Sequence, residues 1–151
     1  MSPARLLATW FGVGYATIAP GTWGSLAALP FAALIAWLAG PWALVPAAAV
    51  LFLLGCWASD RVSRESRASD PQYVVVDEVV GQWLTLAVAP LDPLAYGLGF
   101  LLFRIADILK PWPAGWADRE VKGGLGIMLD DVLAAIYSAG LLWLAVHYLG
   151  V

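Results

Sequence analysis

The most prominent feature of the hydrophobic pattern is a stretch without any charged residue, at positions 6–59. A membrane-crossing helix needs about 20 apolar residues, so this stretch is long enough for two crossings. A Gly-Pro pair at 40–41 interrupts it, and neither residue continues a helix well. The pattern therefore predicts spans at about 24–39 and 42–58. The glycine-containing segment before them, 6–20, is expected to lie in the membrane interface or to re-enter it.

Three further apolar runs follow, at about 78–90, 94–109 and 127–149. The first two are short for complete crossings, which helix tilt or local thinning of the bilayer would accommodate. We count five spans, with four as the alternative. The expected fold is therefore all-α, a polytopic membrane bundle of four to five short transmembrane helices that forms a single domain, 1–151.

Two polar connectors lie between these runs. Segment 60–72 carries arginines at every third position, which is typical of one face of a short surface helix. Segment 110–125 is rich in proline and glycine and is predicted to be a loop. With five spans, all eight Lys and Arg residues fall on one side of the membrane. Basic loops stay in the cytoplasm, so we expect this side to be cytoplasmic and the C-terminus to be outside.

The composition agrees with a membrane protein and narrows the function. Hydrophobic residues make up 62% of the chain and charged residues 13%, whereas about a quarter of a soluble domain is charged. The net charge of −3 argues against nucleic acid as a partner, since nucleic-acid binding needs a basic face. Cys56 is the only cysteine, so no intramolecular disulfide can form.

Acidic residues recur at the predicted cytoplasmic ends of three helices. Asp77 and Glu78 open the third apolar run, Asp107 lies near the end of the fourth, and Asp130 and Asp131 begin the fifth. The helix dipole explains a single acid in a first turn, but not two adjacent pairs, nor Asp107 at a C-terminal end. Converging carboxylates without His or Cys favour a hard cation such as Mg²⁺. We therefore expect these five residues to be metal ligands, with Asp131, Glu78 and Asp107 as catalytic residues.

Basic residues and helix starts accompany these acids. Arg104 and Asp107 share a helix face because they are three residues apart, and Lys110 continues the row. Lys122 precedes two glycines at the start of the fifth run, and helix starts present N–H groups to anions. Positive-inside topology and snorkelling are the alternative explanation, and it suffices for the connector arginines. The expected phosphate-binding set is Gly21, Thr22, Arg104, Lys110 and Lys122.

Three stretches of the sequence resemble a known family. They are APGTWGS (19–25), VVDEVVGQW (75–83) and, within 103–134, FRIADILKPWP followed by DREVKGGLGIMLDDVLA. They resemble the phosphatidylglycerophosphatase A family of bacterial inner-membrane enzymes. The resemblance implies Mg²⁺-dependent removal of the terminal phosphate of phosphatidylglycerophosphate, giving phosphatidylglycerol, at the cytoplasmic face of the inner membrane. Ala106 departs from the family pattern, where a bulky aromatic residue is expected, and this affects packing more than chemistry.

Other classes of protein fit the sequence less well. A Mg²⁺-dependent phosphatidyl-group transferase also places carboxylates at helix ends, but its Asp-Gly…Ala-Arg…Gly…Asp…Asp signature is absent. An ion or metal transporter predicts ionisable residues on both sides of the bilayer centre, whereas here the Asp, Glu, Lys and Arg residues, Asp92 excepted, are confined to one face. The only histidine, His147, lies on the far side, so a histidine nucleophile is not expected. The sequence gives no indication of oligomeric state.

Overall fold

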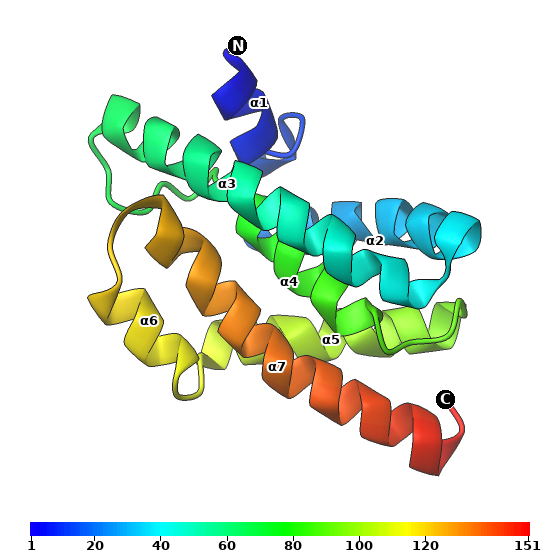
Figure 1. Cartoon of the computed structure of the whole chain (residues 1–151). Helices are drawn as coiled ribbons and strands as arrows, with labels where there is room; N and C mark the ends of the chain where they lie inside the picture. Colours follow the sequence, from blue (N-terminus) through cyan, green and yellow to red (C-terminus); the bar gives the residue numbers. More distant parts are fainter.

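The computed structural model describes residues 1–151 and contains helices but no strands. Its elements, in order, are α1 (Pro3–Ala8), η1 (Val13–Tyr15), α2 (Pro20–Ala39), η2 (Pro41–Ala43), α3 (Leu44–Ser66), α4 (Val76–Leu86), α5 (Pro93–Leu109), α6 (Ala114–Glu120) and α7 (Gly123–Leu149). The elements η1 and η2 are single turns of 3-10 helix. Figure 1 shows how they form one bundle. The all-helical fold predicted from the sequence is confirmed.

Three segments are long and apolar enough to cross a membrane: α2, the continuous η2–α3 segment Pro41–Ser66, and α7. The other two helices of the bundle are shorter, with 11 residues in α4 and 17 in α5. At 1.5 Å per residue α4 is only about 16 Å long, against about 30 Å for the hydrocarbon core of a bilayer. The four to five predicted spans therefore correspond to three long helices and two shorter ones.

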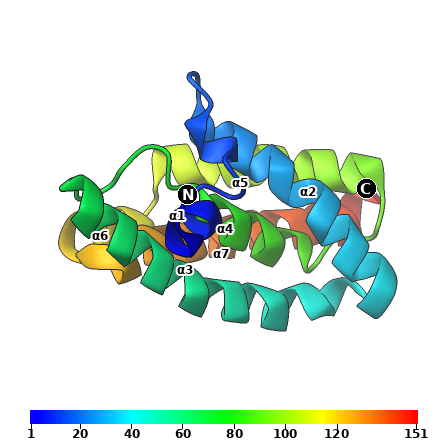
Figure 2. The ribbon, with the colours of Figure 1, turned by 90° about the horizontal axis from the view of Figure 1, so that it is seen from above.

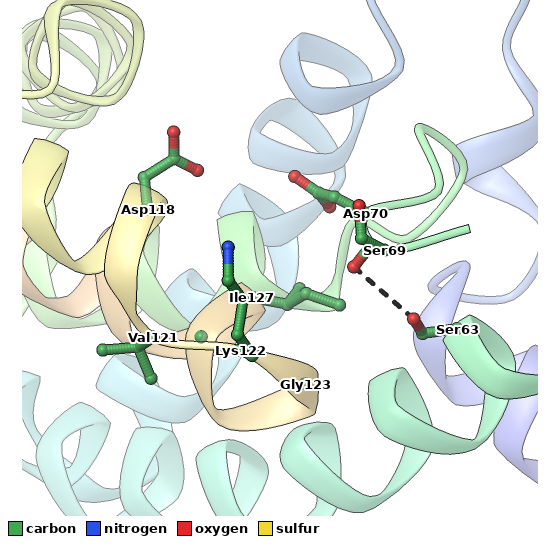
Figure 3. Close-up of a pocket in the computed structure, with 9 residues that line it drawn as sticks. Ser63, Ser69, Asp70, Asp118, Val121, Lys122, Gly123 and Ile127 are labelled. Atoms are coloured by element: carbon green, nitrogen blue, oxygen red, sulfur yellow. Dashed lines mark hydrogen bonds between the residues drawn. The ribbon is translucent and has the colours of Figure 1, made fainter. Parts of the chain in front are cut away.

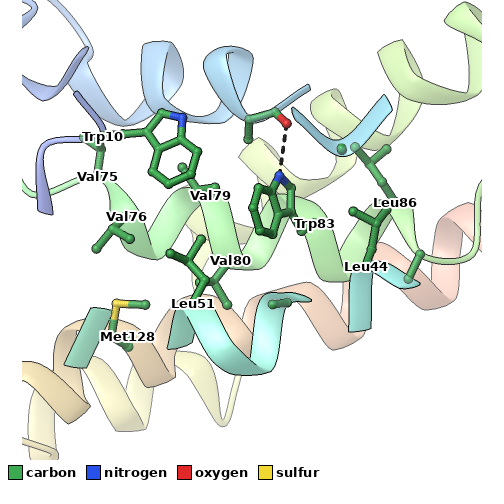
Figure 4. Packing of buried hydrophobic residues seen from close by; sticks show 14 of the residues in the cluster. Trp10, Leu44, Leu51, Val75, Val76, Val79, Val80, Trp83, Leu86 and Met128 are labelled. Atoms are coloured by element: carbon green, nitrogen blue, oxygen red, sulfur yellow. Dashed lines mark hydrogen bonds between the residues drawn. The ribbon is translucent and has the colours of Figure 1, made fainter. Parts of the chain in front are cut away.

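The short helix α4 lies among the long helices and packs against α2, α3 and α7. Its side chains Val76, Val79 and Val80 are fully buried in the apolar core (Figure 4). Two turns along α4 from Val76, the indole N–H of Trp83 donates a 3.1 Å hydrogen bond to the carbonyl of Ala28 in α2. A helix that is apolar on most sides is buried by its neighbours. This packing holds the N-terminus of α4, with its two acidic residues, inside the bundle.

A close contact between backbones fixes the start of α7 on α3. A Cβ atom at Gly124 would collide with the carbonyl oxygen of Cys56. The N–H of Gly124 also donates a 3.2 Å hydrogen bond to Oδ1 of Asp60 in α3. Small residues let membrane helices approach in this way. The contact sets the position of α7, and with it the position of the acidic pair two turns further along.

The basic residues gather toward one end of the bundle. That end is formed by α1, the last turns of α3, the end of α5, and α6, whereas the α2–α3 turn, the α4–α5 turn and the C-terminus lie at the other end (Figures 1 and 2). All eight Lys and Arg residues belong to the first group of segments or to the connectors that join them. The distribution is the one that the sequence predicted.

Two local predictions are corrected by the structure. The connector 60–72 does not form a separate surface helix, because α3 continues without a break to Ser66. The predicted loop 110–125 contains α6, a helix of seven residues that follows a cis Trp112–Pro113 peptide. Prolines and glycines on both sides hid this short helix from the sequence pattern. The N-terminal segment forms α1 and η1, and its location in the membrane interface stays a prediction.

Candidate active site

Three helices bring the predicted acidic residues into one cluster. Asp77 and Glu78 lie in the first turn of α4, Asp107 in the last turn of α5, and Asp130 and Asp131 two turns into α7. The exposed fraction is only 1% for Asp131 and 8% for Asp77, and Asp107 and Asp130 are buried as well. Glu78 is half-buried. Burying ionised carboxylates this deeply is costly, so positive partners are needed to keep them charged.

Two basic side chains supply part of that positive charge. Arg104 forms an ion pair with Asp107. The Nζ atom of Lys110, at the end of α5, lies 3.0 Å from Asp107 Oδ1, 2.7 Å from Asp130 Oδ2 and 3.7 Å from Asp131 Oδ1. Burial alone would lower the pKa of Lys110, but the charges of these three carboxylates outweigh it and keep the pKa above its ordinary value. Lys110 therefore stays charged and joins α5 to α7.

The acidic and basic residues line a pocket of about 500 Å³. Another part of its wall is the start of α2, from Ala19 to Gly21. No side chain caps this helix. Its first residue is a proline, and the N–H groups of Thr22 and Trp23 donate to the carbonyl of Ala19, so the N–H of Gly21 is the one available to an anion. A Cβ atom at position 21 would lie 2.7 Å from Oε1 of Glu78, so glycine lets this carboxylate lie against the start of α2. The pocket thus combines carboxylates, cations and a helix N-terminus.

The carboxylates suit a metal ion that prefers oxygen ligands. They form two groups that share Asp131, and within each group one oxygen per residue lies within 4.8 Å of the others: Asp77, Asp130 and Asp131, and Glu78, Asp107 and Asp131. Four buried carboxylate oxygens have no hydrogen-bond partner: Asp77 Oδ1, Glu78 Oε2, Asp130 Oδ1 and Asp131 Oδ2. Unpaired oxygens at this depth are rare unless a ligand satisfies them. With oxygen as the only donor atom, the residues fit Mg²⁺.

Eight of the ten residues predicted for the site line this pocket, and Thr22 and Lys122 do not. Thr22 is half-buried beside Gly21. Lys122 instead lines a separate pocket of about 140 Å³ together with Ser63, Asp70 and Asp118 (Figure 3). Its Nζ atom donates a 2.9 Å hydrogen bond to the carbonyl of Arg119. The structure does not bring Lys122 to the carboxylates, so its role in binding phosphate stays a prediction.

Two other acidic residues were not singled out by the sequence pattern. Asp70 lines both pockets, although it lies in the polar connector 60–72, whose arginines were explained by topology alone. Asp60 accepts the hydrogen bond from the start of α7 described above, across 64 positions of the chain. A contact at such a distance leaves no trace in local spacing. An acidic residue immediately before a proline, as at Asp70, also occurs in ordinary turns.

These features define a class of protein. The chain is a membrane-embedded helical protein with a polar pocket at the basic end of the bundle. Carboxylates there can hold a divalent cation and accept a proton from water, while Arg104, Lys110 and the start of α2 can hold an anion. That combination suits the chemistry of a phosphate ester at the surface of a membrane.

Comparison with known proteins gives the family. The phosphatidylglycerophosphatase A family model matches residues 6–146. The chain is 41% identical to phosphatidylglycerophosphatase A of Escherichia coli over 149 residues, which cover 97% of this chain and 86% of that protein. It is also 41% identical to the Haemophilus influenzae protein of the same name over 139 residues, with 91% and 85% covered. No solved structure matches the chain.

A third relative carries a different name. The chain is 38% identical over 146 residues to a Bacteroides thetaiotaomicron protein provisionally named phosphatidylinositol-3-phosphatase, with 88% of this chain and 87% of that protein covered. The chain belongs to the phosphatidylglycerophosphatase A family, as its three sequence stretches predicted. It is accordingly a phosphatase, an enzyme that hydrolyses phosphoric monoesters.

Proposed function

We propose that the protein removes the terminal phosphate of phosphatidylglycerophosphate to give phosphatidylglycerol, and that it requires Mg²⁺. Family membership and the names of the two relatives that are 41% identical support this substrate. The observation that carries the proposal is the pocket itself, in which buried carboxylates with unpaired oxygens face two cations and an uncapped helix start. A metal-assisted phosphatase needs both kinds of group in one site: carboxylates to bind the metal ion, and positive groups to bind the phosphate.

The residues of the pocket would bind the phosphate, accept a proton from water and orient the cationic side chains. Arg104, Lys110 and the Gly21 N–H would hold the phosphate oxygens and oppose the negative charge that develops in the transition state. Asp131 and Glu78 each keep an unpaired oxygen, so either is placed to take a proton from the attacking water. Asp107 is held by both cations and would orient them. Mg²⁺ held by the acidic cluster would polarise the phosphoryl group.

The substrate is expected to approach from the bilayer. The pocket of about 500 Å³ is large enough for a phosphate and part of its head group, and three long apolar helices place the chain in lipid. The acyl chains would then remain between the helices and the surrounding membrane. Because all basic residues lie toward the same end as the pocket, the positive-inside rule favours a site on the cytoplasmic face of the bacterial inner membrane.

The direct test is phosphate release by the purified protein in detergent micelles. Phosphatidylglycerophosphate should be hydrolysed in Mg²⁺ and not in EDTA, and activity should return when Mg²⁺ is added back. Phosphatidylinositol 3-phosphate, suggested by the name of the third relative, should be run beside it at equal concentration. A higher kcat/KM for the inositol lipid would overturn the proposed substrate. Equal release in Mg²⁺ and in EDTA would overturn the metal dependence.

A further inference from the structure

We propose that the acidic cluster holds two divalent cations, with Asp131 as a ligand shared by both. The inference rests on the proposed function, in that it assigns the number of ions in the same site. Asp77 and Asp130 would complete the first ion's protein ligands, and Glu78 and Asp107 those of the second. These are the two groups of close carboxylate oxygens that the structure contains, and Asp131 is the only member of both.

Distances within the cluster favour two ions over one. Mg²⁺ binds its ligands at about 2.1 Å in an octahedron, so two donor atoms on one ion are at most about 4.2 Å apart. The compact groups contain three residues each, and they do not merge into a single group of five. One ion could therefore use one group only, and the other group would remain without a metal ion. Paired ions in phosphatases lie about 3.5–4 Å apart, a spacing that a shared carboxylate can bridge.

Unpaired oxygens point to a ligand on each side of Asp131. In the first group Asp77 Oδ1 and Asp130 Oδ1 have no partner, and both residues are more than nine-tenths buried. In the second group Glu78 Oε2 has none. Asp131 is 1% exposed and itself keeps Oδ2 unpaired. Each group thus presents buried acceptors that the protein leaves unsatisfied, which is unfavourable unless a ligand binds them.

The balance of charge in the pocket also favours two ions over one. Five carboxylates face two cations, Arg104 and Lys110, so with every carboxylate ionised the cluster would carry three excess negative charges. The ion pairs of these cations reach Asp107, Asp130 and Asp131, whereas no Lys or Arg nitrogen lies within 4.0 Å of Asp77 or Glu78. A phosphate monoester would add close to two negative charges. One Mg²⁺ would leave about three charges uncompensated, and two ions would leave about one.

Manganese provides a probe that does not depend on turnover. The full-length protein in detergent, stripped with EDTA and dialysed against Mn²⁺, should bind two ions per chain. Its electron paramagnetic resonance spectrum should show a spin-coupled pair instead of the six-line signal of an isolated ion. Asp77→Asn and Glu78→Gln should each bind one ion and show the isolated signal. Both changes preserve side-chain shape, and circular dichroism would verify that the variants are folded.

Glu120→Gln is the matched control, because it removes one acidic charge from an exposed residue of α6 that lines neither pocket. It should still bind two coupled ions. One ion per wild-type chain at saturation, with an uncoupled spectrum, would overturn the inference. Two ions retained in both Asp77→Asn and Glu78→Gln would also overturn it, since the ions would then lie elsewhere. Phosphate release by the same samples separates this result from the proposed function: activity with one bound ion refutes only the pair, and two coupled ions without activity refute only the function.

Discussion

Substitution of Gly21 by alanine changes the site while leaving the fold almost untouched. The added methyl group would lie 2.7 Å from Glu78 Oε1 and 3.5 Å from Arg104 Nη1. Ordinary contact with a Cβ atom begins at about 3.4 Å, so the Glu78 carboxylate must retreat by about 0.7 Å. Glu78 is a flexible side chain and can make this movement at little cost in stability. Alanine in place of glycine within a helix recovers up to about 1 kcal/mol, so the free energy of unfolding should be unchanged or slightly higher.

Catalysis should respond much more strongly than stability. A displacement of this size in a reacting group costs about 100-fold in rate, so we expect kcat for phosphate release to fall by about that factor. Gly97→Ala is the matched control, since a methyl group at that position of α5 would meet no atom within 4 Å. The control should match the wild-type rate and gain stability by a similar amount. A folded Gly21→Ala protein with a rate within about threefold of wild type would refute the placement of Glu78 against the start of α2.

Three further variants test other parts of the account. Lys110→Met removes the shared partner of three carboxylates and should destabilise the protein in EDTA by about 3 kcal/mol, measured by thermal unfolding. Mg²⁺ should restore most of this loss, and equal melting temperatures for variant and wild type in EDTA would contradict the prediction. Gly124→Ala forces a methyl group against the backbone carbonyl of Cys56, which cannot move aside as a side chain can. The free energy of unfolding should fall by about 3 kcal/mol in the same measurement, and an unchanged melting temperature would argue against the close crossing of α3 and α7. Arg61→Ala breaks an exposed ion pair with Glu65 worth about 0.5 kcal/mol, so turnover should stay at the wild-type level, and a large loss would mean that α3 contributes to the site.

The acidic cluster could be predicted because charge is rare in this sequence. Against a long apolar background, pairs such as Asp77-Glu78 and Asp130-Asp131 stand out, and the topology of the runs places them at one end of the bundle. The row formed by Arg104, Asp107 and Lys110 follows from helical spacing, although Lys110 itself lies just beyond α5. These predictions needed only the order of the apolar runs and the cost of burying charge.

The position of the Lys122 side chain could not be predicted in this way. Its place before two glycines at a helix start suggested an anion site, but α6 forms within the preceding segment and the Lys122 side chain turns to the Arg119 carbonyl. The contact made by Asp60 was not predicted at all. Helix α3 continues past the predicted end of its span at residue 58, and this brings Asp60 to Gly124. The positions of Lys122 and Asp60 both depend on where a helix begins or ends. Helix ends are set by tertiary packing more than by the local sequence pattern.

We propose that the carboxylates around Asp131 form the catalytic site of a lipid phosphatase. The most direct test compares phosphate release from phosphatidylglycerophosphate by wild-type protein and by Asp131→Asn, in Mg²⁺ and in detergent. Asp131 is almost fully buried and belongs to both carboxylate groups, so its replacement should lower turnover by at least about 1,000-fold. The variant should remain folded, because asparagine has the same shape as aspartate. A folded Asp131→Asn protein that hydrolyses the lipid at a rate close to wild type would contradict the account.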